Sequence, residues 1–228
     1  MPSFLQGFFW GSPAMRRKRA AALTAFITNW DTTSSSEMIT LPATSTSNNF
    51  TVDWGDGSAI ETVTTASPTH IYVSIGNYNI TIEGTCPAWS FSNTGDKLKI
   101  KDVSNWGIVG FTNLFSAFYG CSNMTTSASD AGDFSAVTNM YAMFQFASVA
   151  NPDVSNWNVS SVKNMYNMFF FASLSNINYD LLLAAWSLQT LQSGVPFHAG
   201  GAKYTETAGR AVLTSSPNNW TITDGGAL

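Results

Sequence analysis

Few side chains in this 228-residue sequence could carry out chemistry. Its two histidines, His70 and His198, could each act as a general base or bind a metal ion. Asp53 and Asp56 flank a Trp-Gly pair, and closely spaced aspartates of this kind can bind Ca²⁺. The candidate chemistries are therefore acid–base catalysis and metal binding.

The surroundings of these residues support neither chemistry. A calcium loop of the EF-hand type that began at Asp53 would need oxygen ligands at Gly55 and Gly57, and a glutamate at Thr64. His70 falls within a predicted strand, where packing is the simpler role. The sequence has no His-Glu-x-x-His, Cys-x-x-Cys, Gly-x-Ser-x-Gly or phosphate-loop motif. We therefore predict a non-enzymatic protein with no catalytic residue, metal or cofactor.

Three further aspartates, Asp102, Asp133 and Asp153, belong to a repeated pattern. The segment Asp102–Trp106 (DVSNW) recurs word for word at Asp153–Trp157, and Asp133–Ser135 is a degraded copy. Glycoside hydrolysis needs two carboxylates facing one cleft, whereas an aspartate that occurs once per repeat is expected to be structural. A polysaccharide-processing enzyme is the disfavoured alternative.

A second repeated segment lies between and after these words. Its three copies begin at Asn113, Asn139 and Asn164, which are 26 and 25 positions apart. A period in the twenties is typical of leucine-rich repeats. After each asparagine, apolar residues follow at i, i+3 and i+4, which predicts a short helix over 114–118, 140–144 and 165–169. Stacked copies would bury these faces in one core, with a methionine-lined ligand site as the less favoured reading. The predicted core residues are Trp106, Leu114, Phe118, Met140, Met143, Phe144, Trp157, Met165, Met168 and Phe169.

The repeats resemble the BspA-like leucine-rich-repeat surface proteins. The resemblance rests on DVSNWNVSSVKNMYNMFFFASL (153–174), on FSAFYGCSNM (115–124) and on the closing stretch 181–226, and it covers roughly residues 96–226. It implies a short right-handed solenoid with a strand and a short helix in each repeat. It also implies surface recognition and not catalysis.

The preceding region is predicted to contain strands, because β-branched and aromatic residues alternate with polar ones between turn signals. The words WGDGS (54–58) and H-x-Y…G-x-Y-x-I (70–80) resemble a polycystic-kidney-disease-type (PKD) domain, and the likeness covers about residues 24–92. It implies an immunoglobulin-like β-sandwich that acts as a spacer or adhesion module. The predicted strands are 26–30, 38–41, 50–54, 60–65, 70–73 and 78–82.

The predicted fold is mainly β with short helices (α+β). A PKD/immunoglobulin-like β-sandwich at residues 23–95 is followed by BspA-like leucine-rich repeats at 96–178. Residues 179–228 would form a capping unit, because helical spacing at 179–190 and 208–213 precedes a strand at 220–223.

Residues 1–22 are predicted to be an arm that anchors the chain to a larger assembly. Their apolar part precedes the basic cluster, so they do not fit an export signal. We expect the arm to be ordered through contacts with other proteins. The residues expected to make them are Phe8, Phe9, Trp10, Arg16, Arg17, Lys18 and Arg19.

The composition limits the partners. Only 11% of residues are charged, the net charge is −4 and the pI is about 4.9, so a nucleic-acid partner is not expected. No apolar run is long enough to span a membrane. Cys86 and Cys121 are predicted to be free and buried, over a disulfide as the alternative.

These features favour a structural and recognition protein on the surface of a bacteriophage particle, as a capsid decoration protein or a tail fibre or spike component. Its partners would be capsid or tail proteins through residues 1–22, and host surface glycans or proteins. A bacterial cell-surface adhesin is the alternative. The sequence leaves the receptor and the oligomeric state open, homo-oligomers included.

Overall fold

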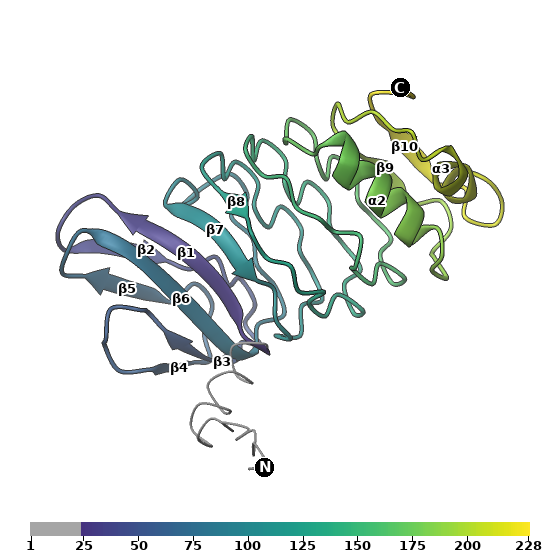
Figure 1. The fold of residues 1–228 in the computed structure, drawn as a ribbon. Coiled ribbons are helices and arrows are strands. Elements are labelled where there is room, and N and C mark those ends of the chain that lie inside the picture. Colours follow the sequence, from purple (N-terminus) through teal and green to yellow (C-terminus); the bar gives the residue numbers. More distant parts are fainter. Residues whose placement is uncertain (1–23) are drawn as a thin grey trace, which may run out of the picture.

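The computed structural model describes residues 24–228, and Figure 1 shows an elongated molecule with strands at one end and helices at the other. The described part is mainly β, with the two short helices α2 and α3. The strands are β1 (Phe26–Thr32), β2 (Glu37–Thr40), β3 (Asn49–Asp53), β4 (Glu61–Val63), β5 (Thr69–Tyr72), β6 (Gly76–Thr85), β7 (Ile100–Asn105), β8 (Thr125–Thr126), β9 (Pro196–His198) and β10 (Thr221–Thr223), and the helices are α2 (Asn176–Trp186) and α3 (Thr207–Thr214).

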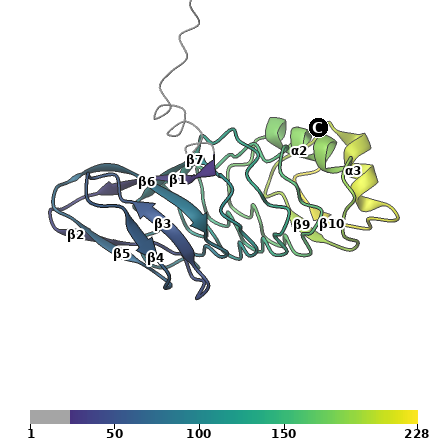
Figure 2. The same cartoon turned by 90° about the horizontal axis from the view of Figure 1, so that it is seen from below.

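The first half of the described chain forms two packed sheets. One sheet has the strand order β4-β3-β6-β1-β7-β8, and the second pairs β2 with β5. Along β1, buried and partly exposed residues alternate, so Phe26 and Trp30 enter the core. The sheets meet where Tyr72 of β5 stacks on Tyr78 of β6, with ring centroids 4.1 Å apart. Figure 2 shows β2 and β5 on the side opposite to β1 and β6.

The six-stranded sheet continues from the first half into the repeats. Strand β1 pairs with β6 along one edge and with β7 along the other, and both pairings are antiparallel. Strand β7 contains most of the first DVSNW word and pairs in parallel with β8. Residues on the two sides of the predicted boundary at 95/96 therefore share one sheet and one hydrophobic core.

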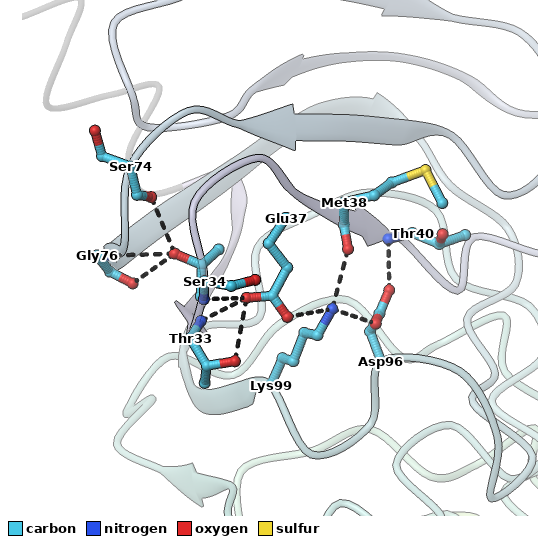
Figure 3. A network of polar contacts seen from close by, with 10 residues as sticks. Thr33, Ser34, Glu37, Met38, Thr40, Ser74, Gly76, Asp96 and Lys99 are labelled. Carbon is cyan, nitrogen blue, oxygen red and sulfur yellow. Dashed lines mark hydrogen bonds and ion pairs between the residues drawn. The ribbon is translucent and has the colours of Figure 1, made fainter.

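A polar network covers the free edge of β2, as Figure 3 shows. Lys99 Nζ lies 2.9 Å from Glu37 Oε1, 2.8 Å from Asp96 Oδ1 and 3.0 Å from the Met38 carbonyl. Asp96 Oδ2 accepts a hydrogen bond of 2.8 Å from the Thr40 N–H. Hydrogen bonds from Lys99 and from the N–H groups of Thr33 and Ser34 lower the pKa of Glu37 to about 2. Two backbone groups on this edge of β2, the Met38 carbonyl and the Thr40 N–H, are thus paired with side chains, which makes the edge less open to another strand.

The short helices predicted over 114–118, 140–144 and 165–169 are wrong, because these segments form turns. In a helix, the Phe118 N–H would bond back within its own segment. Instead it donates to the Met143 carbonyl of the following segment, at 2.7 Å. In the first two segments every second amide, at 114–120 and at 140–146, makes such a bond to the next segment, so a helical ladder cannot form.

The remaining amides close turns within each segment. The Ala117 N–H, for example, donates to the Leu114 carbonyl at 3.2 Å. Between these two residues the backbone enters the left-handed region, which turns successive amides in different directions. The φ angles are 51°, 53° and 58° at Ser116, Ala142 and Asn167. The i, i+3, i+4 spacing still produces a one-sided segment, but through turns.

The turns stack in parallel and bury the predicted core residues. Asn113, Asn139 and Asn164 form successive parallel bridges. All ten predicted core residues, from Trp106 to Phe169, are at most 1% exposed. Phe118, Phe144 and Phe169 stack in a column, with centroid distances of 5.6 Å and 5.4 Å. The repeat therefore supplies one ring per turn to a continuous core.

The C-terminal part covers the last turn. The predicted helices at 179–190 and 208–213 are present as α2 and α3, but α2 ends at Trp186 and not at residue 190. The predicted final strand is present as β10, which pairs in parallel with β9. Helix α2 begins earlier than predicted because the Ser175 hydroxyl accepts the Asn178 N–H and caps it. The Met165 N–H donates to the Pro196 carbonyl, so β9 continues the stack.

Candidate recognition surface

Two rows of aromatic rings follow the stacked turns at the surface, and all of these rings are exposed except those of Tyr119 and Tyr141, which are half-buried. Row one contains Phe115, Tyr141 and Tyr166, with centroid distances of 5.1 Å and 6.0 Å. Row two contains Tyr119, Phe146 and Phe171, with distances of 5.9 Å and 5.0 Å. Within each row, neighbouring rings lie within 21° of parallel. Exposed apolar groups that gather in this way mark interaction surfaces.

The turn geometry determines which rings face outward. Asn113 Oδ1 accepts the N–H of Phe115 at 3.0 Å, and Asn139 and Asn164 do the same for Tyr141 and Tyr166. Each ring of row one therefore follows a buried core residue and projects from the opposite side of the backbone. Phe115 is 41% exposed and Tyr166 is 51% exposed, whereas the preceding core residues are fully buried.

The rows lie on turns with few charges. Between residues 113 and 171 the charged residues are Asp130, Asp133, Asp153 and Lys163. The aspartates also have structural roles, since Asp133 and Asp153 accept the N–H groups of Ser135 and Ser155. Asp102 likewise binds Thr125 and Ser127 of the next turn. This surface can offer ring stacking and neutral hydrogen bonds but no charged catalytic pair.

His70 and Asp56, which the sequence singles out, do contact each other. His70 Nε2 lies 2.8 Å from Asp56 Oδ2, and the imidazole stacks on Trp54 with centroids 4.9 Å apart. Burial opposes ionisation of Asp56, but hydrogen bonds from Ser58 and His70 outweigh it and lower its pKa to about 2. Asp53 Oδ1 accepts the Gly55 N–H, so both aspartates brace this turn.

His198 lies apart from that pair, beside the end of row two. Its Nδ1 accepts the Gly200 N–H at 3.0 Å, and its ring contacts Phe170 edge to face at 5.2 Å. Burial lowers the pKa of His198, and Asp224 opposes that shift. Among residues 24–228, no three His, Cys, Asp or Glu side chains gather as a metal site. No helix in the same range is long and apolar enough to cross a membrane.

The predicted anchoring residues between Phe8 and Arg19 lie outside the described residues, as does the expectation that the arm is ordered. The aromatic rows were not among the predicted site residues. A signal for row one was present, because an aromatic residue directly follows the first buried residue of each repeat at Phe115, Tyr141 and Tyr166.

The two cysteines are free and buried, as predicted from the sequence. Burial raises the pKa of the Cys86 thiol to about 12 and raises the pKa of Cys121 as well. Since the thiolate is the reactive form, we expect neither to react with Ellman's reagent in the native protein at pH 8. Both should react after denaturation in guanidinium. Rapid labelling of the native protein would contradict this prediction.

Residues 88–199 match the family model described as "Mycoplasma protein of unknown function, DUF285". This segment, the DUF285 region, includes all the stacked turns and both aromatic rows, and the match fits the BspA-like resemblance. No curated protein and no solved structure matches the chain.

Proposed function

We propose that this chain is a non-enzymatic recognition protein carried on the surface of a bacteriophage particle. The observation that carries the proposal is the pair of aromatic rows on the DUF285 region. A protein with no surface partner has little use for rings such as Phe171, which is 61% exposed, aligned in a stack. The stacked turns present them on a rigid backbone, which lowers the entropy cost of binding.

The proposal also assigns the finer fold. The packed sheets before residue 96 are a PKD-like, immunoglobulin-like sandwich, and the stacked turns to residue 178 are a short BspA-like solenoid closed by the C-terminal cap. The core that runs through both modules supports this, because it makes the sandwich a stiff base for the turns. The exposed rings would face host glycans or proteins.

Attachment to the particle is assigned to residues 1–22. Three aromatic and four basic residues of this segment form the predicted anchor. The four basic residues are a large share of the ten lysines and arginines in the whole chain. Such a segment suits a groove between capsid or tail subunits. This gives the protein a decoration, fibre or spike position.

A bacterial cell-surface adhesin is the second candidate. The observation that favours it is the description of the matching family model, which names a Mycoplasma protein. The same rings and turns would serve either carrier, because both present the protein to another surface. The carrier is therefore what the experiment must distinguish.

The test is to locate the full-length protein in fractions of its source culture. Mass spectrometry of gradient-purified virus particles should detect it at a fixed copy number relative to the major shell protein. Cryo-electron microscopy of those particles should then trace residues 1–22 between subunits. Absence from the particles together with presence in the bacterial envelope would overturn the phage proposal in favour of the adhesin.

A further inference from the structure

Row two stops one ring short of the end of the stack. The Phe118 N–H donates to the Met143 carbonyl, and Phe146, a ring of row two, lies three residues after Met143. In the same way, the Phe144 N–H donates to the Met168 carbonyl, and Phe171, the next ring of row two, lies three residues after Met168.

The same rule leads to a glycine on the last turn. The Phe169 N–H donates to the His198 carbonyl, and three residues later stands Gly201. A Cβ atom added to Gly201 would meet nothing within 4 Å. The last turn therefore carries no ring at this place in the row, and the space beside Gly201 is open.

The open position is a cavity of about 360 Å³. Two segments line it, one with Phe170–Ala172 and one in the C-terminal part with His198, Gly200 and Gly201. Phe171 is stacked on Phe146 at 5.0 Å, and its interplanar angle there is only 7°. Phe170 meets Phe171 edge to face at 4.5 Å, so the ring that borders the cavity is held from two directions.

The cavity also has one defined polar group. His198 Nδ1 is occupied as an acceptor of the Gly200 N–H, so in the neutral ring the proton is on Nε2. Burial lowers the pKa of His198 and thereby favours that neutral ring. A neutral N–H donor beside an aromatic wall suits a ligand that has an apolar face and hydroxyl groups around its edge.

We propose that this cavity, the Phe171 slot, binds one pyranose ring of a surface glycan, stacked where row two lacks its next aromatic ring. The inference rests on the proposed recognition function and specifies its ligand. A sugar ring presents a C–H face for stacking and hydroxyls for His198, whereas a charged ligand would find no partner among the residues that line the cavity. An extended peptide would need further apolar subsites beyond the slot, and row two supplies none because it ends at Phe171.

The test measures binding of methyl glycosides of glucose, galactose, rhamnose and N-acetylglucosamine to the full chain by saturation-transfer NMR. We expect at least one of them to bind, with a dissociation constant in the millimolar range that is usual for so small a ligand. Phe171→Ser removes the stacking face, and Gly201→Phe completes the row with the protein's own ring. Each should weaken binding at least tenfold.

Ile60→Ser is the matched control, because it removes an exposed apolar side chain that belongs to neither row and does not line the cavity, and it should change the dissociation constant less than twofold. The thermal unfolding midpoints of the variants show whether each one folds. p-Cresol, which mimics a tyrosine side chain, tests whether the slot binds an aromatic side chain of a protein instead of a sugar ring. Binding of p-cresol without any glycoside, or no binding at all, would overturn the slot as a sugar site.

Failure of the slot is distinguishable from failure of the recognition function. Glycoside binding that survives both Phe171→Ser and Gly201→Phe would place the sugar elsewhere and refute the slot, while recognition stands. Absence of the protein from both particles and envelopes would remove the proposed function, and the NMR result does not depend on that outcome.

Discussion

Arg210→Met should destabilise the protein by about 3 kcal/mol at pH 7, because it leaves a buried carboxylate without its cation. Arg210 Nε lies 2.8 Å from Asp224 Oδ2, and the Asp224 side chain is only 6% exposed. The Tyr179 hydroxyl donates to the same oxygen at 2.7 Å. The three groups join α2, α3 and the residue after β10, so the whole cap depends on this pair.

The destabilisation should depend on pH. Burial raises the pKa of Asp224, but hydrogen bonds from Arg210 and Tyr179 outweigh it, so the pKa lies below its ordinary value. In the native protein this contribution to stability is present above the unfolded pKa near 4 and is lost as the pH falls through the folded value. Without Arg210, burial raises the pKa instead, and protonation then relieves the variant's penalty. Urea unfolding followed by tryptophan fluorescence should therefore show a smaller difference from the native protein at pH 4.5 than at pH 7.

Two variants control this experiment. Lys101→Met breaks an ion pair with Asp31 in which both side chains are more than a third exposed, and it should cost less than about 1 kcal/mol. Arg210→Met combined with Asp224→Asn removes both charges and should recover part of the lost stability. A loss for Arg210→Met that is the same at both pH values would show that packing, and not charge, explains it.

The sequence predicts well those features that depend on local alternation. Phe50 and Val52 alternate with polar neighbours and form β3, and β4, also among the predicted strands, returns beside it. The pairing of β1 with β7 was not predictable in this way, since it joins segments about 70 residues apart. Long-range pairing depends on which edges remain free after local folding, and no local pattern records that.

The repeats show a different limit. The spacing of Leu114, Ala117 and Phe118 is compatible with a helix and also with a turn whose middle residue is left-handed. What decides is whether the Phe118 N–H finds its acceptor in its own segment or in the next one, and the stack supplies the second. The same stacking exposes Phe146 and Phe171, so the candidate surface follows from a geometry that spacing alone does not contain.

The second large effect is expected at Trp157, where three copies of the repeated word meet. Trp157 packs on Phe134 with centroids 4.1 Å apart, and edge to face on Trp106 at 5.1 Å. These residues come from the degraded middle copy and the first copy of the DVSNW word, so one cluster ties distant turns together. All three are at most 1% exposed.

Trp157→Ala should lower the free energy of unfolding by about 3–5 kcal/mol, because it leaves a large cavity among rings that are held by their own turns. The neighbours cannot collapse into the space, since the backbone amides of successive turns are already paired with each other. Equilibrium urea unfolding followed by far-ultraviolet circular dichroism measures the change without relying on tryptophan emission.

Trp157→Phe separates packing from hydrogen bonding at this position. The Trp157 Nε1 is buried and has no hydrogen-bond partner among the described residues, so phenylalanine gives up no such bond. It keeps a stacked ring and should cost only about 1–2 kcal/mol. Phe115→Ala, at an exposed ring of row one, should cost less than about 1 kcal/mol. If Trp157→Ala cost no more than Phe115→Ala, the stacked turns would not be held together by this cluster, and the rigidity that the proposed recognition surface needs would have to come from the backbone bonds between turns alone.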